Sequence, residues 1–405
     1  MSNSLIEELA TQRVWEEYLA YRLIKGRLNW HEFEEADAYV EREEYLPDAE
    51  GILRGEGFGV PKRSIINKMG TNKKRIVYSF DQRRMTLLKV LAYQLYRYDD
   101  SFAPNCYAFR QGLRPTDALL RLNRAVGNRR LWCYKVDVSN YFNSISVPLL
   151  LPKLKVLFGE DVMLYNFFEQ MLTDQRAECD GGIIYEPRGV MAGTPTASFL
   201  ANVYLSEMDH YFYERGVVYA RYSDDIVLFA EDRATLEEYM AIVARFLNSH
   251  RLEVNPSKER IYSPDEPYEF LGFRCLDAAV DISAVSVEKM KGKIRRKTRA
   301  LMRWKARKDI SPERAMARLI GYFNRKFYGG DEAQALTWAR WYFPIINRHE
   351  SLQEIDHYLQ QSIRMLATGR VAKSNYRIGY DELKRLGYRS LVNEYYKWRS
   401  SDSIQ

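Results

Sequence analysis

The sequence predicts an α+β fold, in which helical regions flank a mixed middle region. Apolar residues recur at helical spacing over residues 4–46 and again from Val287 onward. Between them lie apolar runs of strand length at residues 75–80, 131–138 and 217–230. Strands and helices do not alternate regularly, so a doubly wound parallel sheet is not expected. With 405 residues, 46% of them hydrophobic, the chain can form a sizeable core.

The first half passes from helices into strands. Residues 51–61 (GILRGEGFGVP) contain four glycines and a proline, which end the N-terminal helical pattern. A basic stretch from Lys62 to Lys74 then leads into the strand RIVYSF. The next expected elements are a helix, a strand, a helix and a hairpin, at residues 82–98, 131–138, 148–173 and 179–187.

The second half centres on an acidic hairpin. The tetrapeptide GTPT (193–196) predicts a helix start, with Thr194 as the cap and Pro195 in the first turn, and a helix that continues to about Tyr213. VVYARYSDDIVLFA (217–230) predicts two strands around a tight turn. A helix, a strand and a helical C-terminal region follow, at residues 232–250, 268–275 and from 287.

Composition indicates a polyanionic partner and excludes several classes of protein. The formal net charge is +7, and residues 286–308 hold eleven Lys or Arg and one acid. Such a run is typical of nucleic-acid binding, although a solvated helix face has the same composition. The four cysteines form no CxxC pair, so neither structural zinc nor a disulfide framework is expected. The expected location of the protein is therefore a reducing cytoplasm. Neither a signal peptide nor an apolar run of transmembrane length is found.

Two acidic segments carry the chemistry. Tyr222-Ser223-Asp224-Asp225 lies between apolar strand halves, where a structural turn would favour Asn-Gly or Asp-Gly. Asp137 ends the apolar run LWCYKVDV. Taken singly, these acids are also consistent with a solvated turn and a helix cap. If the two strands are neighbours, however, Asp137 and Asp224 can share two metal ions about 4 Å apart, which suits phosphoryl transfer.

These acids belong to a series of motifs that resembles the reverse transcriptase family. The series runs in the family's order from a fingers motif, through palm motifs A and B, the YxDD box and motif D, to the primer grip. In this chain the segments are RIVYSF, YAFRQG (107–112), DVSNYF (137–142), GVMAGTPTASFLANVYL (189–205), YSDD (222–225), LEVNPSK (252–258) and FLGF (270–273). The resemblance implies a right-hand polymerase fold with fingers, palm and thumb, a helical N-terminal extension and a helical C-terminal tail.

The resemblance also implies roles for individual residues. Asp137, Asp224 and Asp225 would bind two Mg²⁺ ions, for which Mn²⁺ can substitute, together with the carbonyl of Val138. Lys258 would act as the general acid for pyrophosphate.

Other motif positions would contact the nucleotide and the nucleic acid. Lys74 and Arg75 would clamp the triphosphate, and Phe142 would be the steric gate that excludes a ribose 2′-hydroxyl. Ala192 replaces a Gln of many relatives, which leaves the nucleotide contacts open. The primer grip would use Phe270, Leu271 and Gly272, although core packing explains the first two equally well. The thumb helix would contact phosphates through Arg295, Arg296 and Arg299.

Four regions are implied by the resemblance. They are an N-terminal extension (1–52), interleaved fingers and palm (53–285), a helical thumb (286–345) and a helical C-terminal region (346–405). Elements typical of retron, group II intron and viral enzymes are not recognised, which favours a stand-alone bacterial enzyme of antiphage defence. Its expected partners are a dedicated structured non-coding RNA as template, dNTPs and the cDNA product. No oligomeric state is predicted.

Alternative functions remain open at this point. A template-independent DNA polymerase or terminal transferase would use the same metal site, and a retron-type enzyme would differ mainly in its RNA. An RNA-binding module with an inactive polymerase fold would not need three acids, and Phe142 argues against an RNA-dependent RNA polymerase.

Overall fold

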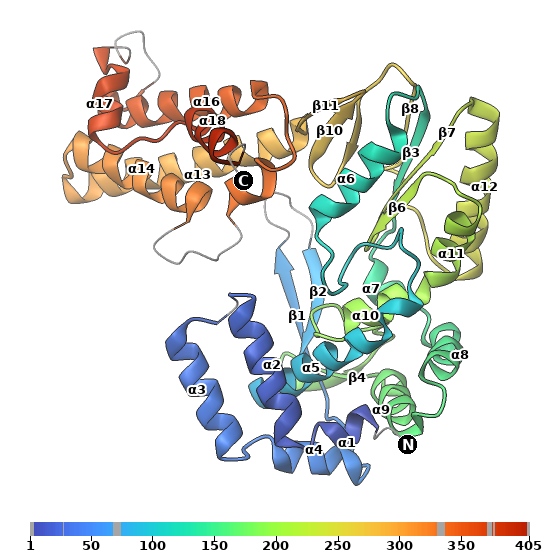
Figure 1. Cartoon of the computed structure of the whole chain (residues 1–405). Helices are drawn as coiled ribbons and strands as arrows, with labels where there is room; N and C mark the ends of the chain where they lie inside the picture. The colour runs from blue at the N-terminus through green and yellow to red at the C-terminus, as the bar shows by residue number, and fades with distance from the viewer. Residues whose placement is uncertain are drawn as a thin grey trace. The chain divides into compact units, whose positions relative to one another are not determined.

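The computed structural model describes residues 4–26, 28–67, 74–329, 337–370, 375 and 377–402 (Figure 1). The chain divides into two compact units, Met1–Pro264 and Asp265–Gln405, and each is described by itself. The mixture of helices with three small sheets confirms the α+β class. The four predicted regions stay a prediction. Among the described residues, no helix has both the length and the apolar character that crossing a membrane requires.

The first unit begins with helices α1 (Leu5–Glu8), α2 (Gln12–Ile24), α3 (Trp30–Glu41) and α4 (Leu46–Leu53). The sequence predicted helical structure over residues 4–46 without its interruptions. Helix α3 begins at a capping box. The Asn29 side chain accepts a hydrogen bond from the Glu32 backbone N–H, and the Glu32 carboxylate accepts one from the Asn29 backbone N–H. That reciprocal pair is the local signal for a new helix.

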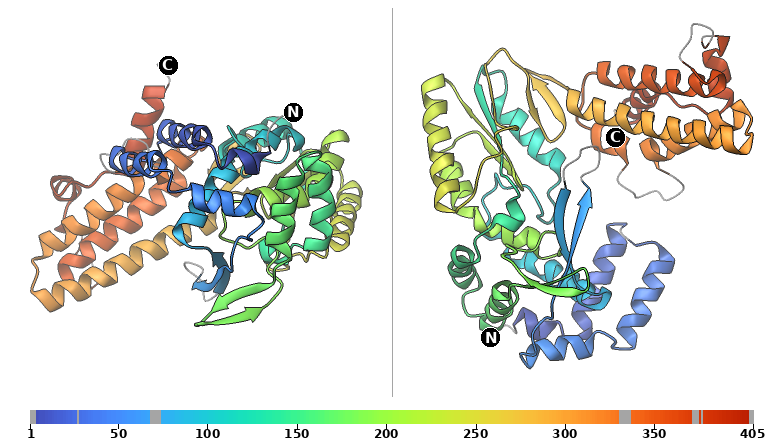
Figure 2. Two further views of the ribbon diagram at one scale, coloured as in Figure 1. Left: turned by 90° about the horizontal axis from the view of Figure 1, so that it is seen from below. Right: turned by 180° about the vertical axis from the view of Figure 1, so that it is seen from behind.

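A four-stranded sheet with the order β2-β1-β4-β5 follows. Strands β1 (Lys62–Asn67) and β2 (Lys74–Ser79) are antiparallel, so part of the predicted basic stretch is a strand, while residues 68–73 lie outside the described residues. The predicted hairpin is formed by β4 (Arg176–Cys179) and β5 (Gly182–Tyr185). Figure 2 shows these two green strands extending beyond the neighbouring helices of this unit.

The second sheet of this unit carries the acidic turn. Its strand order is β6-β7-β3-β8, and its members are β3 (Trp132–Asp137), β6 (Tyr219–Tyr222), β7 (Asp225–Ala230) and β8 (Arg260–Tyr262). All its pairings are antiparallel, and β3 and β7 are central. Helix α12 (Arg233–Ser249) packs on β3 and β7, and α6 (Pro115–Val126) packs on β6. The two inner strands are therefore held in a fixed register.

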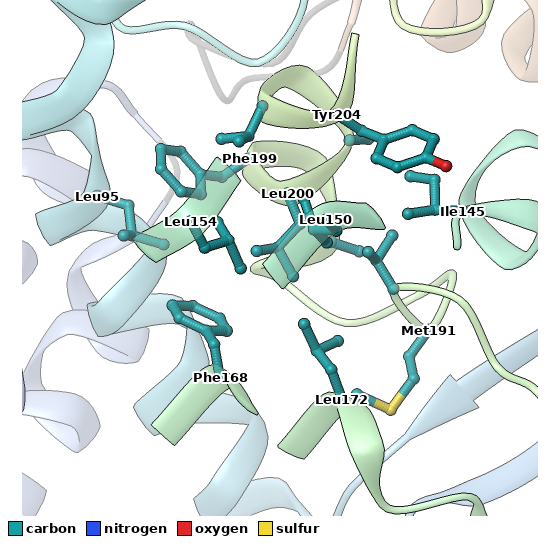
Figure 3. Packing of buried hydrophobic residues seen from close by; sticks show 14 of the residues in the cluster. Leu95, Ile145, Leu150, Leu154, Phe168, Leu172, Met191, Phe199, Leu200 and Tyr204 are labelled. Carbon is teal, nitrogen blue, oxygen red and sulfur yellow. The ribbon is translucent and has the colours of Figure 1, made fainter. Parts of the chain in front are cut away.

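An apolar core lies among the helices of the same unit (Figure 3). It includes Leu150 and Leu154 of α8 (Val147–Phe158), Phe168 of α9 (Val162–Thr173) and Leu200 of α10 (Ala197–Tyr204), all fully buried. The remaining helical elements are α5 (Gln82–Gln94), η1 (Leu95–Ser101), α7 (Tyr141–Ser144) and α11 (Ser206–Glu214).

The helix start predicted at Thr194 and Pro195 was wrong. Helix α10 begins at Ala197, after Thr196, and Leu205 separates it from α11. The Thr194 hydroxyl instead donates to the Met191 carbonyl at 3.0 Å, so it stabilises the preceding turn.

The second unit joins a small sheet to a helical bundle. The sheet order is β11-β10-β9, with β9 (Tyr268–Phe270), β10 (Phe273–Leu276) and β11 (Ala279–Ile282). Residues 268–275, predicted as one strand, are two strands joined by the turn at Leu271 and Gly272, both with positive φ. The helices are α13 (Ala284–Lys308), α14 (Pro312–Tyr328), α15 (Trp338–Tyr342), α16 (Glu350–Thr368), α17 (Tyr380–Arg385) and α18 (Leu391–Asp402).

Candidate active site

The three acids predicted to bind metal meet at one end of the second sheet. Asp137 is the last residue of β3, and its pairing partner is Asp225, the first residue of β7. The backbone N–H of Val138 donates to the Asp224 carbonyl at 3.1 Å. Residues far apart in the sequence therefore form one cluster, because the β3–β7 register places their strand ends together.

The turn that presents Asp224 is conformationally demanding. Tyr222 pairs with Asp225, so the turn consists of Ser223 and Asp224. Ser223 has a φ of 63°, in the left-handed region that favours Gly or Asn. Behind the turn, the Arg221 guanidinium donates to the Ser223 carbonyl at 3.2 Å. A buried side chain thus supports a turn whose sequence does not favour it.

The acids at the turn are poorly compensated. Oδ1 of Asp225 is buried without a hydrogen-bond partner among the described residues, and the Lys135 ammonium lies 3.6 Å from it. Burial raises the pKa of Asp225 to about 6, with Asp137 and Asp224 acting in the same direction and Lys135 opposing. Burial and the charge of Asp137 also raise the pKa of Asp224. The buried oxygen and the raised pKa values both indicate excess negative charge at this site, which a bound cation would neutralise.

Lys258 lies directly on this cluster. Its ammonium donates to Oδ2 of Asp137, while the Asp137 carbonyl accepts from the Asn255 N–H at 2.8 Å. The Lys258 side chain remains 43% exposed. Its predicted role as a general acid stays a prediction, and its position beside a metal-binding acid is compatible with it.

The donor set suits a hard divalent cation. Among the described residues, no group of three or more His, Cys, Asp or Glu side chains is arranged to hold a metal ion by itself. Mg²⁺ commonly binds through one or two carboxylates and completes its shell with water and substrate phosphates. The Asp225 oxygen, which has no hydrogen bond among the described residues, and the mutual repulsion of Asp137 and Asp224 fit that incomplete arrangement.

Phe142 and Ala192, two of the predicted nucleotide-binding residues, lie beside Asn143. Asn143 was not identified as a site residue from the sequence. Its side-chain oxygen accepts from the Ala192 N–H at 2.9 Å, and its side-chain nitrogen donates to the Ile76 carbonyl at 3.0 Å. The carbonyl of Phe142 accepts from Val190 at 2.9 Å. Phe142 and Ala192 are thus tied to β2.

Two glycines make these close approaches possible. A Cβ at Gly189 would lie 2.3 Å from the Phe142 carbonyl oxygen, and one at Gly193 would lie 2.8 Å from that of Tyr78. Both residues also have positive φ. Any larger residue would force apart the segments that carry Phe142 and β2.

Lys74 and Arg75 begin β2 and are exposed. The charge of Arg75 acts on Asp224, where it opposes the rise in pKa, so Arg75 lies within electrostatic reach of the acids.

The remaining predicted residues belong to the second unit. Phe270 is fully buried, which agrees with core packing. At Gly272 a Cβ would meet the Ser286 hydroxyl at 3.0 Å and the Tyr342 hydroxyl at 3.2 Å. On α13, the predicted residues Arg295, Arg296 and Arg299 are exposed, as are Lys289, Arg303, Arg307 and Lys308. The roles proposed for all these residues stay predictions.

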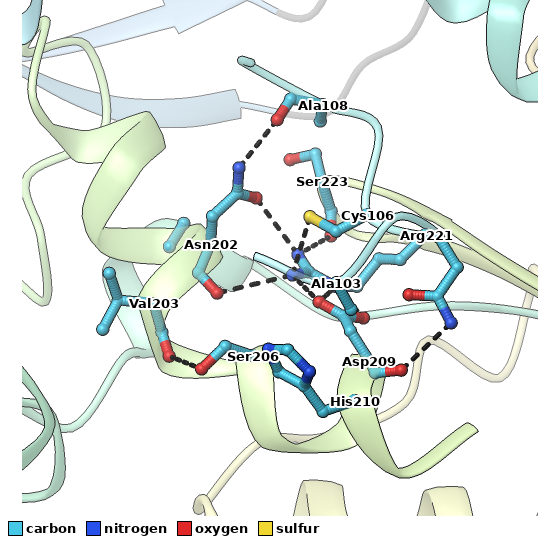
Figure 4. A network of polar contacts seen from close by, with 12 residues as sticks. Ala103, Cys106, Ala108, Asn202, Val203, Ser206, Asp209, His210, Arg221 and Ser223 are labelled. Carbon is cyan, nitrogen blue, oxygen red and sulfur yellow. Dashed lines mark hydrogen bonds and ion pairs between the residues drawn. The ribbon is translucent and has the colours of Figure 1, made fainter. Parts of the chain in front are cut away.

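A buried ion pair behind the acidic turn was also missed (Figure 4). Arg221 and Asp209 have fully buried side chains, and Arg221 Nε donates to Asp209 Oδ1 at 2.8 Å. Arg221 also reaches Asn202 and Cys106. The available signal was an arginine inside the apolar run VVYARY, since a buried cation requires a partner.

Comparison with known proteins places these features in context. The family model for reverse transcriptase (RNA-dependent DNA polymerase) matches residues 60–275. The retron Mx65 reverse transcriptase of Myxococcus xanthus is 27% identical over 214 residues, which cover 50% of this chain and 47% of that protein. The chain thus spans about half the length of this curated relative.

Two solved structures show weaker similarity. The telomerase of Candida albicans, in complex with a fragment of telomeric RNA, has a TM-score of 0.46 and 11% identity, covering 81% of this chain and 63% of that one. The apo telomerase of Candida tropicalis also has a TM-score of 0.46 and 11% identity, covering 82% and 69%.

Proposed function

Because the chain belongs to the reverse transcriptase family, we propose that it is an RNA-directed DNA polymerase that copies RNA into cDNA. One observation carries the proposal: Asp137, Asp224 and Asp225 meet at one end of a sheet, where a buried carboxylate oxygen has no hydrogen bond from the part of the chain that the structure describes. These acids and the Val138 carbonyl would hold two Mg²⁺ ions, or Mn²⁺ in their place. When bound, the ions supply activation of the primer hydroxyl and neutralisation of the triphosphate.

The chain's own residues would position the substrates. Arg75, together with Lys74, would bind the triphosphate, and Phe142 would lie against the sugar. Lys258, already hydrogen-bonded to Asp137, would transfer a proton to the leaving pyrophosphate. The second unit would hold the nucleic acid, through the 270–272 turn and through the exposed arginines of α13, which would contact phosphates without reading sequence.

The regions predicted from the sequence are assigned to the same scheme. Residues 53–285 would form the fingers and palm and residues 286–345 the thumb, between an extension (1–52) and a tail (346–405). The template would be a dedicated structured non-coding RNA, and the setting antiphage defence in a bacterial cytoplasm. A retron-type enzyme is the second candidate, because the curated relative is a retron reverse transcriptase. Sequencing the nucleic acid that copurifies with the protein tests the two candidates.

The activity is tested with an RNA template of mixed sequence annealed to a DNA primer. We expect dNTP incorporation in Mg²⁺ by the wild-type protein and none by the isosteric variant Asp224→Asn with Asp225→Asn. Asp180→Asn is the matched control, because Asp180 is an aspartate of a hairpin turn in the same unit, between β4 and β5. Incorporation by the double variant at the wild-type rate would refute the metal site.

Omission of one dNTP separates templated from untemplated synthesis. A templated polymerase stops where the missing nucleotide is required, whereas a terminal transferase continues to add the nucleotides that remain. Continued addition would replace the proposed function with the template-independent alternative.

A further inference from the structure

Phe109 has a conformation that its residue type does not favour. Its φ of 61° lies in the left-handed region, which bulky residues rarely adopt. The residue is 41% exposed, so core packing does not explain its conformation either. Strained backbone of this kind persists only where the surrounding structure enforces it, and it is concentrated at functional sites.

The Phe109 ring lies against two motifs of the candidate active site. Its centroid is 6.1 Å from that of Phe142, with an interplanar angle of 74°, an edge-to-face contact. Its centroid is also 6.3 Å from that of Tyr222, the last residue of β6, two residues before Asp224. Phe109 therefore connects the candidate steric gate to the segment that presents Asp224.

The segment before Phe109 is fixed to β6 and α10. Cys106 forms a β-bridge with Arg221, whose N–H donates to the Asn105 carbonyl at 3.0 Å, and the Tyr107 N–H donates to the Arg221 carbonyl at 3.0 Å. The Asn202 side chain donates to the Ala108 carbonyl at 2.7 Å, as Figure 4 shows. The backbone immediately before Phe109 is thus held by two elements.

The segment after Phe109 is fixed as well. Arg110 donates to the Ala103 carbonyl at 3.0 Å and to the Asp99 carbonyl at 2.8 Å. The Gln111 N–H donates to the Asp99 carboxylate at 2.6 Å. With both neighbours anchored, the loop enforces the left-handed conformation and directs the ring toward Phe142.

We propose that Phe109 is a positioning residue for sugar discrimination, which acts by restricting the rotation of the Phe142 ring. Without the Phe109 edge beside it, Phe142 gains space to move, and a ribose 2′-hydroxyl meets less steric resistance. The inference rests on the proposed polymerase function, and it concerns selectivity between rNTPs and dNTPs rather than the metal chemistry.

The test compares substitutions that separate the ring from the backbone. Phe109→Asn removes the ring but tolerates positive φ, so it preserves the loop. We expect this variant to incorporate dNTPs and to lose roughly tenfold in dNTP-over-rNTP selectivity, measured as the ratio of kcat/KM values. Phe109→Tyr retains the ring and the wild-type ratio. Tyr213→Asn, at another exposed aromatic of the same unit, is the control and leaves the ratio unchanged.

A double-mutant cycle tests the route through Phe142. In a Phe142→Ala background, Phe109→Asn should have no further effect on selectivity, because the ring it restrains is gone. A full additional effect would refute action through Phe142.

Each remaining outcome is also decisive. An unchanged ratio for Phe109→Asn overturns the inference while leaving the polymerase function intact, whereas an inactive wild-type protein overturns the proposed function itself. If Phe109→Asn does not fold, Phe109→Leu replaces it, since it keeps apolar bulk without the flat ring, and a wild-type ratio there overturns the inference.

Discussion

Asp209 and Asp225 are both acids of the first unit that contact residues of strand β6 or pair with them, but their surroundings are opposite. The Asp209 side chain is fully buried and accepts from Arg221 and from the Tyr219 hydroxyl, the latter at 2.8 Å. Asp225 has a buried oxygen without a hydrogen bond among the described residues, and the neighbouring carboxylates at Asp137 and Asp224 raise its pKa further. One carboxylate is fully compensated, and the other is left short of positive charge.

The difference separates an acid that supports the fold from an acid that serves a reaction. Burying an ionised group without a partner is costly, so sequences selected for stability alone pair it or replace it. The Arg221–Asp209 pair fixes the strand that leads into the turn, while Asp225 keeps its charge available. Stability and activity should therefore respond in opposite ways to substitutions in the two places.

The largest effect is expected at Asp137. Asp137→Asn removes a metal-binding charge and should lower the rate of incorporation by roughly three orders of magnitude or more, because the ions provide most of the charge stabilisation. Thermal unfolding should show no loss of stability, since like charges at the turn repel less. Single-turnover incorporation measures the rate, and a variant that keeps a large fraction of wild-type activity would contradict the comparison.

The next effect concerns stability. Arg221→Met leaves Asp209 buried and unpaired, which should cost about 3–5 kcal/mol of unfolding free energy. Combining it with Asp209→Leu should recover much of that loss, because neither charge then remains. Urea unfolding of both variants measures the difference. Equal stabilities of the single and double variants would show that the pair is not the structural element inferred above.

A smaller change of opposite sign is expected at Asp225. Its pKa is raised from 3.8 to about 6 in the folded protein, so the charged carboxylate destabilises the metal-free fold increasingly as the pH rises from about 4, and fully above pH 6. Asp225→Asn should then gain about 1–3 kcal/mol at pH 7, a gain that shrinks as the pH falls through 6 and disappears near 4. Thermal unfolding across this pH range, with a chelator present, measures it. A loss of stability at pH 7 would mean that Lys135 compensates Asp225 fully.

The smallest effect on stability is expected at Lys258. Its ammonium is hydrogen-bonded to Asp137, but the side chain is 43% exposed, and such pairs contribute less than about 1 kcal/mol. Urea unfolding of Lys258→Gln should therefore match the wild type closely. A loss of stability comparable to that of Arg221→Met would show that Lys258 has a structural role like that of the Arg221–Asp209 pair.

The acid cluster was predictable because strand pairing and motif order together place Asp137 beside the YSDD turn. The Arg221–Asp209 pair was not, because its two members lie on a strand and a helix whose packing no local pattern specifies. The helix start at Thr194 was wrong for a related reason: Thr194 belongs to the preceding turn, in which its N–H and its hydroxyl both donate to the Met191 carbonyl. Phe109 gave no conformational signal at all, since positive φ is expected at Gly or Asn rather than at Phe.

Asn143 has a consequence for how this chain can vary in evolution. Its amide uses one end to accept from Ala192 and the other to donate to Ile76. An aspartate offers no donor, a serine does not reach both segments, and a glutamine displaces both contacts. Substitution at this position therefore requires compensating changes in two other segments at once, which makes Asn143 a single-residue marker for homologues that share this architecture.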